Sequence, residues 1–299
     1  MSEILRWLAD LVRDVFRTLD WPLFLGLSAL MGIGLAVLYS AGGEAQGTRL
    51  MLAQGARFGV GLLAMWGLSR VSPTRLRAWT PGVFLVSLLP LILVLFIGTG
   101  KHGQHWIDLK LFYLQPSELM KISLPMMMAW YLHREPLPPA IRTVLVAGAL
   151  IALPTGLILL QPDFGTAMLV AASGVFALLL AGLPWWWVGV GVGSVAAAAP
   201  MAWIWLLRPY QKARVMTLFD PESDPLGDGW NIIQSKIAIG GGGMTGKGWG
   251  EGTQSHLNFL PEHTTDFIFA VLSEEFGWIG VAVVLALYLF VVGRCLWIA

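Results

Sequence analysis

The polar stretch from Arg208 to Phe267 holds the residues of this chain whose types and spacing could do chemistry. At its far end, Glu262, His263 and Asp266 stand where polar sequence gives way to a long apolar run. Burial raises the pKa of a carboxyl group and nearby cations lower it, so a carboxylate facing a partly dry region can be tuned into a general base. The sequence therefore predicts Asp266 as a general base, with capping of the following helix as the alternative.

The near end of the stretch carries three cations, Arg208, Lys212 and Arg214. Guanidinium groups match the geometry of phosphate oxygens, so a basic cluster at the outer end of the seventh apolar span fits a phosphate headgroup or a pyrophosphate. Anchoring of a helix end at the membrane interface would explain the same cluster. Both readings stay open at this point.

Between these ends lies a glycine-rich segment, 240–252, which contains Lys247. A nucleotide-binding loop of the Walker type needs a preceding strand and a Ser or Thr directly after the Lys, and Gly248 stands there instead. The composition favours a flexible loop that covers substrate. Residues 231–239 before it have the spacing of a short amphipathic helix.

Two polar groups recur earlier in the chain. Glu118 and Lys121 are three residues apart on a predicted helix whose N-cap is expected to be Ser117, so they can pair. Such a pair either holds two helices together or contacts substrate, and the sequence does not decide between them. Asp163 is expected at the start of another helix, where its carboxylate can cap free N–H groups.

Three further charges interrupt apolar runs, namely Arg57, Glu274 and Glu275. A charge inside a membrane span is expensive and is by default a functional hypothesis. We expect one of the two glutamates to face the interior of the bundle, as a polar relay or as the partner of Arg57.

Composition places these residues in a membrane protein. The 299 residues are 56% hydrophobic and 12% charged, with a mean hydropathy of +0.70, whereas soluble domains carry about 25% charged residues. A net charge of +1 gives no case for a nucleic-acid partner, and the single Cys295 excludes an internal disulfide. The fold class expected is all-α, a polytopic helix bundle with about eight transmembrane spans. These are Trp21–Ser40, Leu50–Ser69, Pro81–Gly98, Ser117–Leu132, Thr143–Leu160, two within Phe164–Leu207 folded at Gly182 to Pro184, and Phe276–Gly293 extended back to Thr265.

The basic residues of the short loops set the expected orientation. They gather on the side of the N-terminus, which is therefore predicted to be cytoplasmic. The organisation predicted is an amphipathic cytoplasmic segment at 1–20, seven spans within 21–207, an extracytoplasmic loop at 208–264 and the eighth span within 265–299. The chemistry would then take place on the extracytoplasmic face.

Four long motifs carry a resemblance to a known family. QPSELMK, QPDFGTA, YQKARVMTLFDPESDPLGDGWNIIQSKIAIGGGG and GTQSHLNFLPEHTTDFIFAVLSEEFG occur in this order. With them the chain resembles the SEDS family of bacterial cell-wall polymerases, and within it the branch that acts in cell elongation and shape maintenance. The resemblance covers essentially the whole chain.

What the resemblance implies is a peptidoglycan glycosyltransferase of the bacterial inner membrane that polymerises lipid II. The family's catalytic aspartate falls on Asp266, its fourth-helix Glu and Lys on Glu118 and Lys121, and its arginine after the seventh helix on Arg214. The usual pattern PExHTDF reads PEHTTDF here, which moves the histidine to His263. Family members have about ten helices, so the sequence is expected to end after the eighth.

The resemblance also implies partners, namely a class B penicillin-binding transpeptidase and the elongation machinery. A divalent cation could assist the departing pyrophosphate, but the sequence contains no cage of carboxylates for one. Two alternatives belong to other classes: a flippase or transporter of a lipid-linked precursor, which would use the charges inside the spans, and a scaffold that docks another membrane helix through its small residues.

Overall fold

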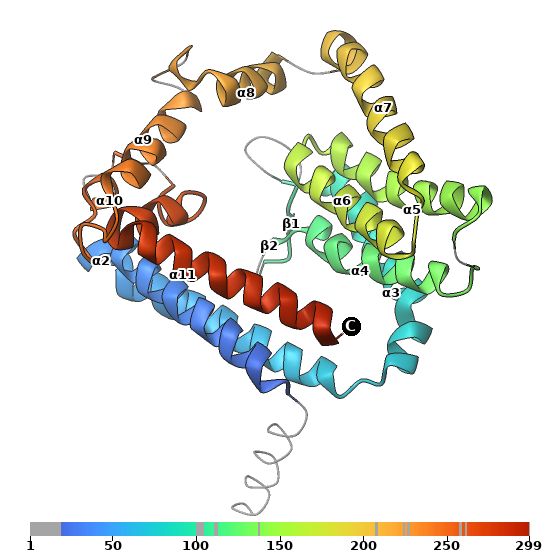
Figure 1. Cartoon of the computed structure of the whole chain (residues 1–299), viewed down its shortest axis with the longest axis horizontal. Helices are drawn as coiled ribbons and strands as arrows, with labels where there is room; N and C mark the ends of the chain where they lie inside the picture. The colour runs from blue at the N-terminus through green and yellow to red at the C-terminus, as the bar shows by residue number, and fades with distance from the viewer. Residues whose placement is uncertain are drawn as a thin grey trace, which may run out of the picture. The chain divides into compact units, whose positions relative to one another are not determined.

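The computed structural model describes residues 19–99, 105–110, 113–136, 138–206, 209–223, 225, 228–256, 259–260 and 262–298. These residues form helices and one short antiparallel ribbon (Figure 1). They divide into two compact units, one made of the residues up to Arg70 together with Trp203–Ala299, the other of Val71–Ala202. The amphipathic segment predicted at 1–20 and the cation Arg208 lie largely or wholly outside the described residues.

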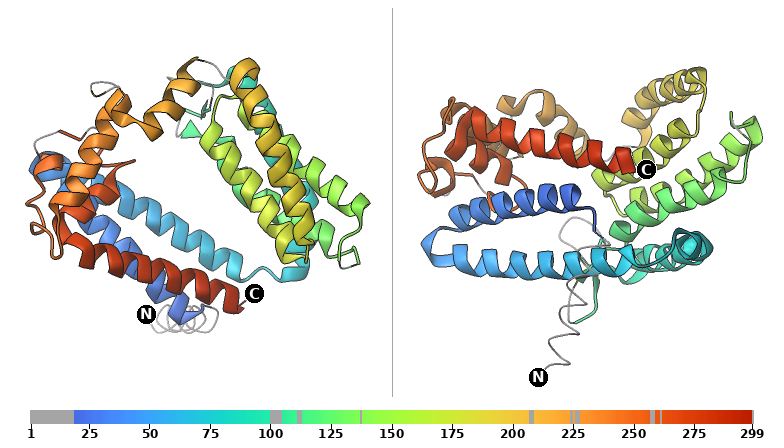
Figure 2. Two further views of the ribbon diagram at one scale, coloured as in Figure 1. Left: turned by 45° about the horizontal axis from the view of Figure 1, so that its top comes forward. Right: turned by 60° about the horizontal axis from the view of Figure 1, so that its bottom comes forward.

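The first unit is built on α2 and α11. Its helices are α2 (Trp21–Ser69), α8 (Pro209–Phe219), α9 (Asp228–Gly241), α10 (Thr253–His256) and α11 (Ile268–Ile298), with a 3₁₀ turn at Pro221–Ser223. α2 is two arms that fold back on each other at Gly43, whose φ is 60° (Figure 2), so the two spans expected here are each helical. The first arm packs against α11 through buried Val37, Ala41, Val271, Leu272 and Val284.

An ion pair joins the beginning of α2 to the end of α11. Arg294 donates from Nη2 and Nε to the carboxylate of Asp20, at 2.7 and 3.1 Å. The other role of Asp20 is to cap α2, since its Oδ1 accepts from the backbone N–H of Leu23 at 2.9 Å. The hydrogen bond from Arg294, and then that from Leu23, hold the pKa of Asp20 below its usual value. Residues 20 and 294 therefore lie at the same end of this helix pair.

The second unit is a bundle of α3 to α7. Its elements are α3 (Pro73–Ile97), β1 (Ile107–Asp108), β2 (Tyr113–Leu114), α4 (Pro116–Leu132), α5 (Ile141–Leu160), α6 (Phe164–Leu180) and α7 (Trp185–Met201). A π-helical turn at Ala202–Leu206 follows α7 and, from Trp203 on, belongs to the first unit. α3, α4, α5 and α6 share one apolar core, in which Leu91, Met120, Leu124, Met128, Ile158 and Val170 are fully buried. This core surrounds α4, which carries the pair Glu118 and Lys121.

The predicted fold between the sixth and seventh spans is confirmed. α6 ends in a Schellman motif, in which the N–H of Leu183 bonds the carbonyl of Leu178 and that of Gly182 bonds Leu179. α7 then begins at Trp185.

Each expected span falls on a helix. Among the described residues, five helical segments are long and apolar enough to cross a membrane, namely Trp21–Gly43, Pro73–Ile97, Ile141–Leu160, Trp185–Trp205 and Ile268–Ile298. Phe164–Leu180 is a shorter apolar helix. The all-α, membrane-embedded fold class is thereby confirmed, and the number of crossings stays a prediction.

Candidate active site

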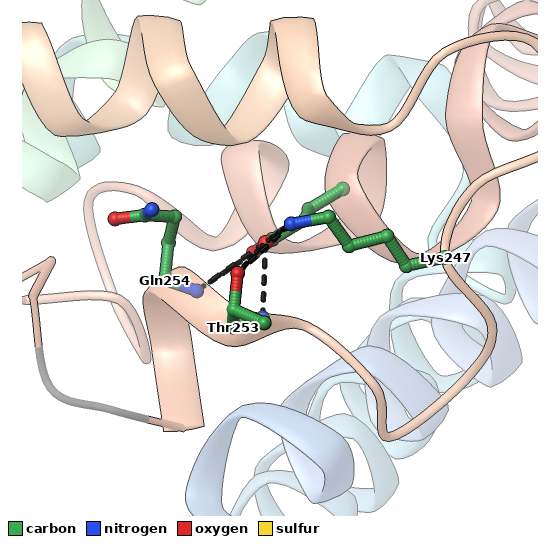
Figure 3. Close-up of polar contacts among 4 residues, drawn as sticks. Lys247, Thr253 and Gln254 are labelled. Carbon is green, nitrogen blue, oxygen red and sulfur yellow. Dashed lines mark hydrogen bonds and ion pairs between the residues drawn. The ribbon is translucent and has the colours of Figure 1, made fainter.

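A buried carboxylate, that of Glu274, organises the polar segment that precedes α11. Its side chain has no exposed surface, and Oε1 accepts from Lys247 Nζ at 2.6 Å. The same oxygen accepts from the backbone N–H and the hydroxyl of Thr253, both at 2.9 Å, and Oε2 accepts from the N–H of Gln254 at 3.2 Å. Lys247, Thr253 and Gln254 thus converge on one carboxylate (Figure 3). A buried charge is tolerated where it is paired and fully hydrogen-bonded, as here.

The glycine-rich segment is bound to α11 rather than free. Four backbone hydrogen bonds of 2.9 to 3.1 Å join the two: Lys247 N to Glu274 O, Gly248 N to Glu275 O, Trp278 N to Gly243 O, and Ile279 N to Met244 O. They form around a break in α11 at Gly277, whose φ is 63° and ψ −162°. The prediction of a flexible covering loop was therefore wrong. The glycines serve close backbone approach, since a Cβ on Gly246 would lie 2.0 Å from the carbonyl oxygen of Glu275.

The segment that carries Asp266 begins at a strained residue. Glu262 has a φ of 59°, a left-handed value that is uncommon outside glycine and that clusters at functional sites. The carbonyl of Glu262 accepts from the N–H of Thr265 at 3.0 Å and of Phe267 at 3.3 Å, which folds the chain into a tight turn around Asp266. His263 contacts the carbonyl of Leu260 through Nδ1 at 2.7 Å; because a carbonyl only accepts, Nδ1 is the protonated nitrogen in this contact.

Asp266 itself is exposed, which corrects the expectation of a partly dry carboxylate. Among the residues that the structure describes, its carboxylate makes no hydrogen bond or ion pair. The capping alternative is not observed there either, since α11 begins at Ile268. The side chain is therefore free to accept a proton from a bound group.

Two residues of the basic cluster, Lys212 and Arg214, lie on α8, a helix separate from α7. Lys212 is half-buried on α8, and Arg214 is on the same helix with its side chain outside the description. Arg208 lies outside the described residues altogether. α8 runs into the 3₁₀ turn at Pro221–Ser223, which packs against α9.

In the second unit, Glu118 and Lys121 pair at 2.7 Å, as predicted. Both keep exposed surface, 53% of the Glu118 side chain and 30% of that of Lys121, so the pair remains accessible to a ligand. The predicted N-cap was wrong: α4 begins at Pro116, Gln115 holds the cap position and Ser117 is buried in the first turn. Proline at the first helical position needs no donor, which is why the helix starts there.

Asp163 caps α6, as predicted. Its Oδ1 accepts from the N–H of Thr166 at 3.1 Å. Its Oδ2 accepts from the Nε2 of Gln115 at 3.4 Å. The contact with Gln115 joins the starts of α4 and α6, a link that the sequence did not reveal.

The other two charges inside apolar spans, Arg57 and Glu275, each have a hydrogen-bond partner. Arg57 Nη1 donates to Gln54 one turn away, at 3.0 Å, on an exposed face of α2. Glu275 is buried and accepts from the hydroxyl of Ser40 on the first arm of α2. Both glutamates are buried, in agreement with the expected interior position, whereas pairing with Arg57, one of the two roles expected there, is not observed among the described residues.

The partners of Glu274 are the functional contacts that sequence reasoning missed. Lys247 is 27 positions from Glu274, and no helical or strand period links them. The usable signal was physical: a charge inside an apolar span needs a partner, and Lys247 is a cation in the adjacent polar stretch.

Composition and membrane-length apolar helices define a polytopic membrane protein, and an accessible acidic turn precedes one of these helices. The sequence profile of the FtsW, RodA and SpoVE family, described as cell cycle proteins, matches residues 18–299. The chain belongs to this family.

Named relatives agree with this assignment. The chain is 46% identical over 282 residues to the peptidoglycan glycosyltransferase MrdB of Escherichia coli K12, covering 94% of this chain and 76% of the relative. It is 36% identical to the probable peptidoglycan glycosyltransferase FtsW of Alkalilimnicola ehrlichii, over 98% of this chain and 76% of that one.

Two solved structures share the fold. A chain from a peptidoglycan synthase complex, studied for the coordination of polymerization and crosslinking, is 33% identical and matches with a TM-score of 0.76 over 92% of this chain and 76% of its own length. The rod shape determining protein RodA of Thermus thermophilus is 26% identical and matches with a TM-score of 0.64 over 92% of this chain and 73% of its own.

Proposed function

We propose that this chain polymerises lipid II into glycan strands on the outer face of the cytoplasmic membrane, with Asp266 as the general base. The relatives are named peptidoglycan glycosyltransferases, and one of them is 46% identical over 94% of this chain. The observation that carries the assignment of Asp266 is its exposed carboxylate, which has no partner among the described residues and stands on a strained turn at the head of α11.

The reaction proposed is a displacement at an anomeric carbon. The 4-hydroxyl oxygen of the acceptor sugar attacks the anomeric carbon of a polyprenyl-pyrophosphate-linked donor. Its proton passes to the carboxylate of Asp266. The bond from the anomeric carbon to the pyrophosphate oxygen breaks, the pyrophosphate leaves with the electron pair, and the configuration inverts.

The other polar residues receive positioning and binding roles in this proposal. Arg208, Lys212 and Arg214 would neutralise the pyrophosphate, for which guanidinium and ammonium groups are suited. Glu118, Lys121, Asp163, Glu262 and His263 would contact the sugars or the acceptor. The pair on α4 keeps exposed surface and is therefore accessible to a ligand, which supports this for Glu118 and Lys121.

Partner and orientation are part of the same proposal. A match to a chain of a synthase complex that polymerises and crosslinks supports a class B penicillin-binding transpeptidase as partner. The contact between Asp20 and Arg294 puts the start of α2 and the end of α11 at one end of their helix pair, as a cytoplasmic location for both requires.

A flippase is the weaker alternative. A headgroup path would need charges that are free along the spans. Arg57 is bonded to Gln54, Glu118 to Lys121, and Glu274 to Lys247 and the start of α10.

The experiment is glycan polymerisation from purified lipid II in detergent, with the transpeptidase added, comparing the chain with Asp266→Asn. A positioned base contributes about 10²- to 10⁴-fold, so the variant should make no detectable polymer while remaining folded in the membrane. Glu251→Gln is the matched control, because Glu251 is an exposed carboxylate of the same polar segment and its loss should leave the rate unchanged. Undiminished polymer from Asp266→Asn would refute the assignment.

A further inference from the structure

The bonds of Glu274 reach the turn that carries Asp266 through a continuous set of contacts. Thr253 and Gln254, which bond the carboxylate, form the start of α10. The carbonyl of Gln254 then accepts from the N–H of Leu260 at 3.2 Å. A displacement of α10 away from Glu274 would therefore also displace Leu260.

Leu260 connects α10 to the turn itself. It is fully buried against Ala238 of α9 and Ala270 of α11, with Phe267 packed on this cluster. Its carbonyl holds the ring of His263. Phe267 directly follows Asp266 in the chain, and its N–H is bonded to Glu262.

The glycine-rich segment, which precedes Thr253, is held in place mainly by backbone hydrogen bonds. The glycine-rich segment is bonded to α11 on both sides of the break at Gly277, and Trp249 donates from Nε1 to the carbonyl of Ala36 at 3.1 Å while stacking on Tyr39. The segment is thus attached to the first arm of α2 as well as to α11. From this segment Lys247, whose side chain is 33% exposed, donates to the fully buried carboxylate of Glu274.

We propose that Glu274 is a positioning residue for the reaction: its buried carboxylate fixes residues 247–254 on α11 and thereby fixes the turn 262–267 in which Asp266 stands. The inference rests on the proposed role of Asp266. It assigns Glu274 no contact with substrate. The anchoring role takes the place of the polar relay expected for Glu274. Among the described residues, every group that donates a hydrogen bond to its carboxylate belongs to the polar segment.

Amide hydrogen exchange of the folded protein tests the anchor without reference to activity. In Glu274→Gln the bonds to a charged acceptor are weakened, so exchange at Thr253, Gln254 and Leu260 should speed up by about 10-fold or more, and that at Thr265 and Phe267 should rise with it. Glu251→Gln removes a carboxylate from the same segment without touching these bonds and should leave exchange unchanged. Unaltered exchange in Glu274→Gln would overturn the proposal.

Steady-state kinetics test whether the loss of this anchor slows the reaction. Misplacing a catalytic group by about 1 Å can cost 10²-fold, so kcat should fall by up to about that factor in Glu274→Gln while KM for the lipid-linked substrate stays within about twofold. A rise in KM at constant kcat would mean that Glu274 binds substrate, and would also overturn the proposal. If Asp266→Asn stays active while exchange in Glu274→Gln behaves as expected, the anchor stands and the assignment of the base falls.

Two further variants test whether the effect of Glu274→Gln comes from misfolding or from charge attraction alone. Lys247→Met leaves the carboxylate its donors from Thr253 and Gln254 but removes its counter-charge. It should change exchange and kcat in the same direction as Glu274→Gln, and no change in either would count against the anchor. The double variant Glu274→Lys with Lys247→Glu restores an ion pair but removes the acceptor at position 274, to which the backbone N–H groups of Thr253 and Gln254 are bonded. It should therefore remain impaired, and full recovery would show that charge attraction alone matters.

Discussion

The break in α11 at Gly277 gives the sharpest stability prediction. Alanine at this position must adopt a φ of 63° and a ψ of −162°, a region that only glycine occupies readily. Its Cβ would lie 2.3 Å from the backbone nitrogen of Gly246 and 2.7 Å from the carbonyl carbon of Met244. Both neighbours are backbone atoms, so the clash cannot be relieved by turning a side chain.

The magnitude follows from these contacts. The backbone conformation alone costs about 1–3 kcal/mol. Moving the glycine-rich segment away would sacrifice the bonds of Trp278 and Ile279 to Gly243 and Met244, at about 1 kcal/mol each. We therefore expect Gly277→Ala to lower the free energy of unfolding by about 3–5 kcal/mol.

The assay is thermal unfolding of the purified protein in detergent. Gly293→Ala is the matched control, since it lies on the same helix and its Cβ would meet no atom within 4 Å. Alanine is the better helix former by about 1 kcal/mol, so Gly293→Ala should hold or raise Tm, whereas Gly277→Ala should lower it by several degrees. Equal Tm values for the two variants would refute the described contact between the segment and α11.

Three other outcomes are expected. The pKa of Asp20 is lowered by its hydrogen bonds from Arg294 and Leu23. The stabilisation that this carboxylate contributes is therefore present above the usual aspartate pKa of about 3.9 and is lost as the pH falls through the lower pKa of the folded protein. The difference in Tm between the protein and Asp20→Asn should shrink below about pH 4. Asp163→Ala should cost about 1 kcal/mol by removing a cap, while Asp163→Asn keeps the cap and should lower polymerisation alone if the charge binds substrate. Lys121→Ala should change the free energy of unfolding by less than about 1 kcal/mol yet reduce the polymerisation rate. An unchanged rate would mean that the pair of Glu118 and Lys121 has a structural role only.

The elements themselves were predictable because their signals are local. Long apolar runs identify membrane-length helices, and Gly182 before Pro184 marks a turn that the Schellman motif at the end of α6 confirms. The cap of α6 by Asp163 was equally readable. The cap of α4 was not, because Ser117 is the better capping residue by type and the preference of Pro116 for the first helical position overrode it.

The contacts of the site were less predictable because they join distant segments. Nothing in a glycine-rich sequence distinguishes a mobile loop from one whose backbone must approach a helix closely, and residues 242–248 proved to be the second kind. Gly277, inside an apolar run, read as an ordinary helix residue. Of the two arguments for Asp266 as the base, the resemblance to a family motif stands and the argument from partial burial does not, since its side chain is exposed.

A charge within an apolar helix is stabilised here because a polar segment of the chain packs against that helix. Glu274 stands within α11, and its neutralising donors come from residues 247–254. The carboxylate that stabilises the start of α10 and the carboxylate proposed as the base therefore belong to one continuous segment, 266–274, so the geometry of one constrains the other. A general base contributes only where its distance to the transferred proton is held. This arrangement favours a turn held by α11 over a cover that closes on substrate.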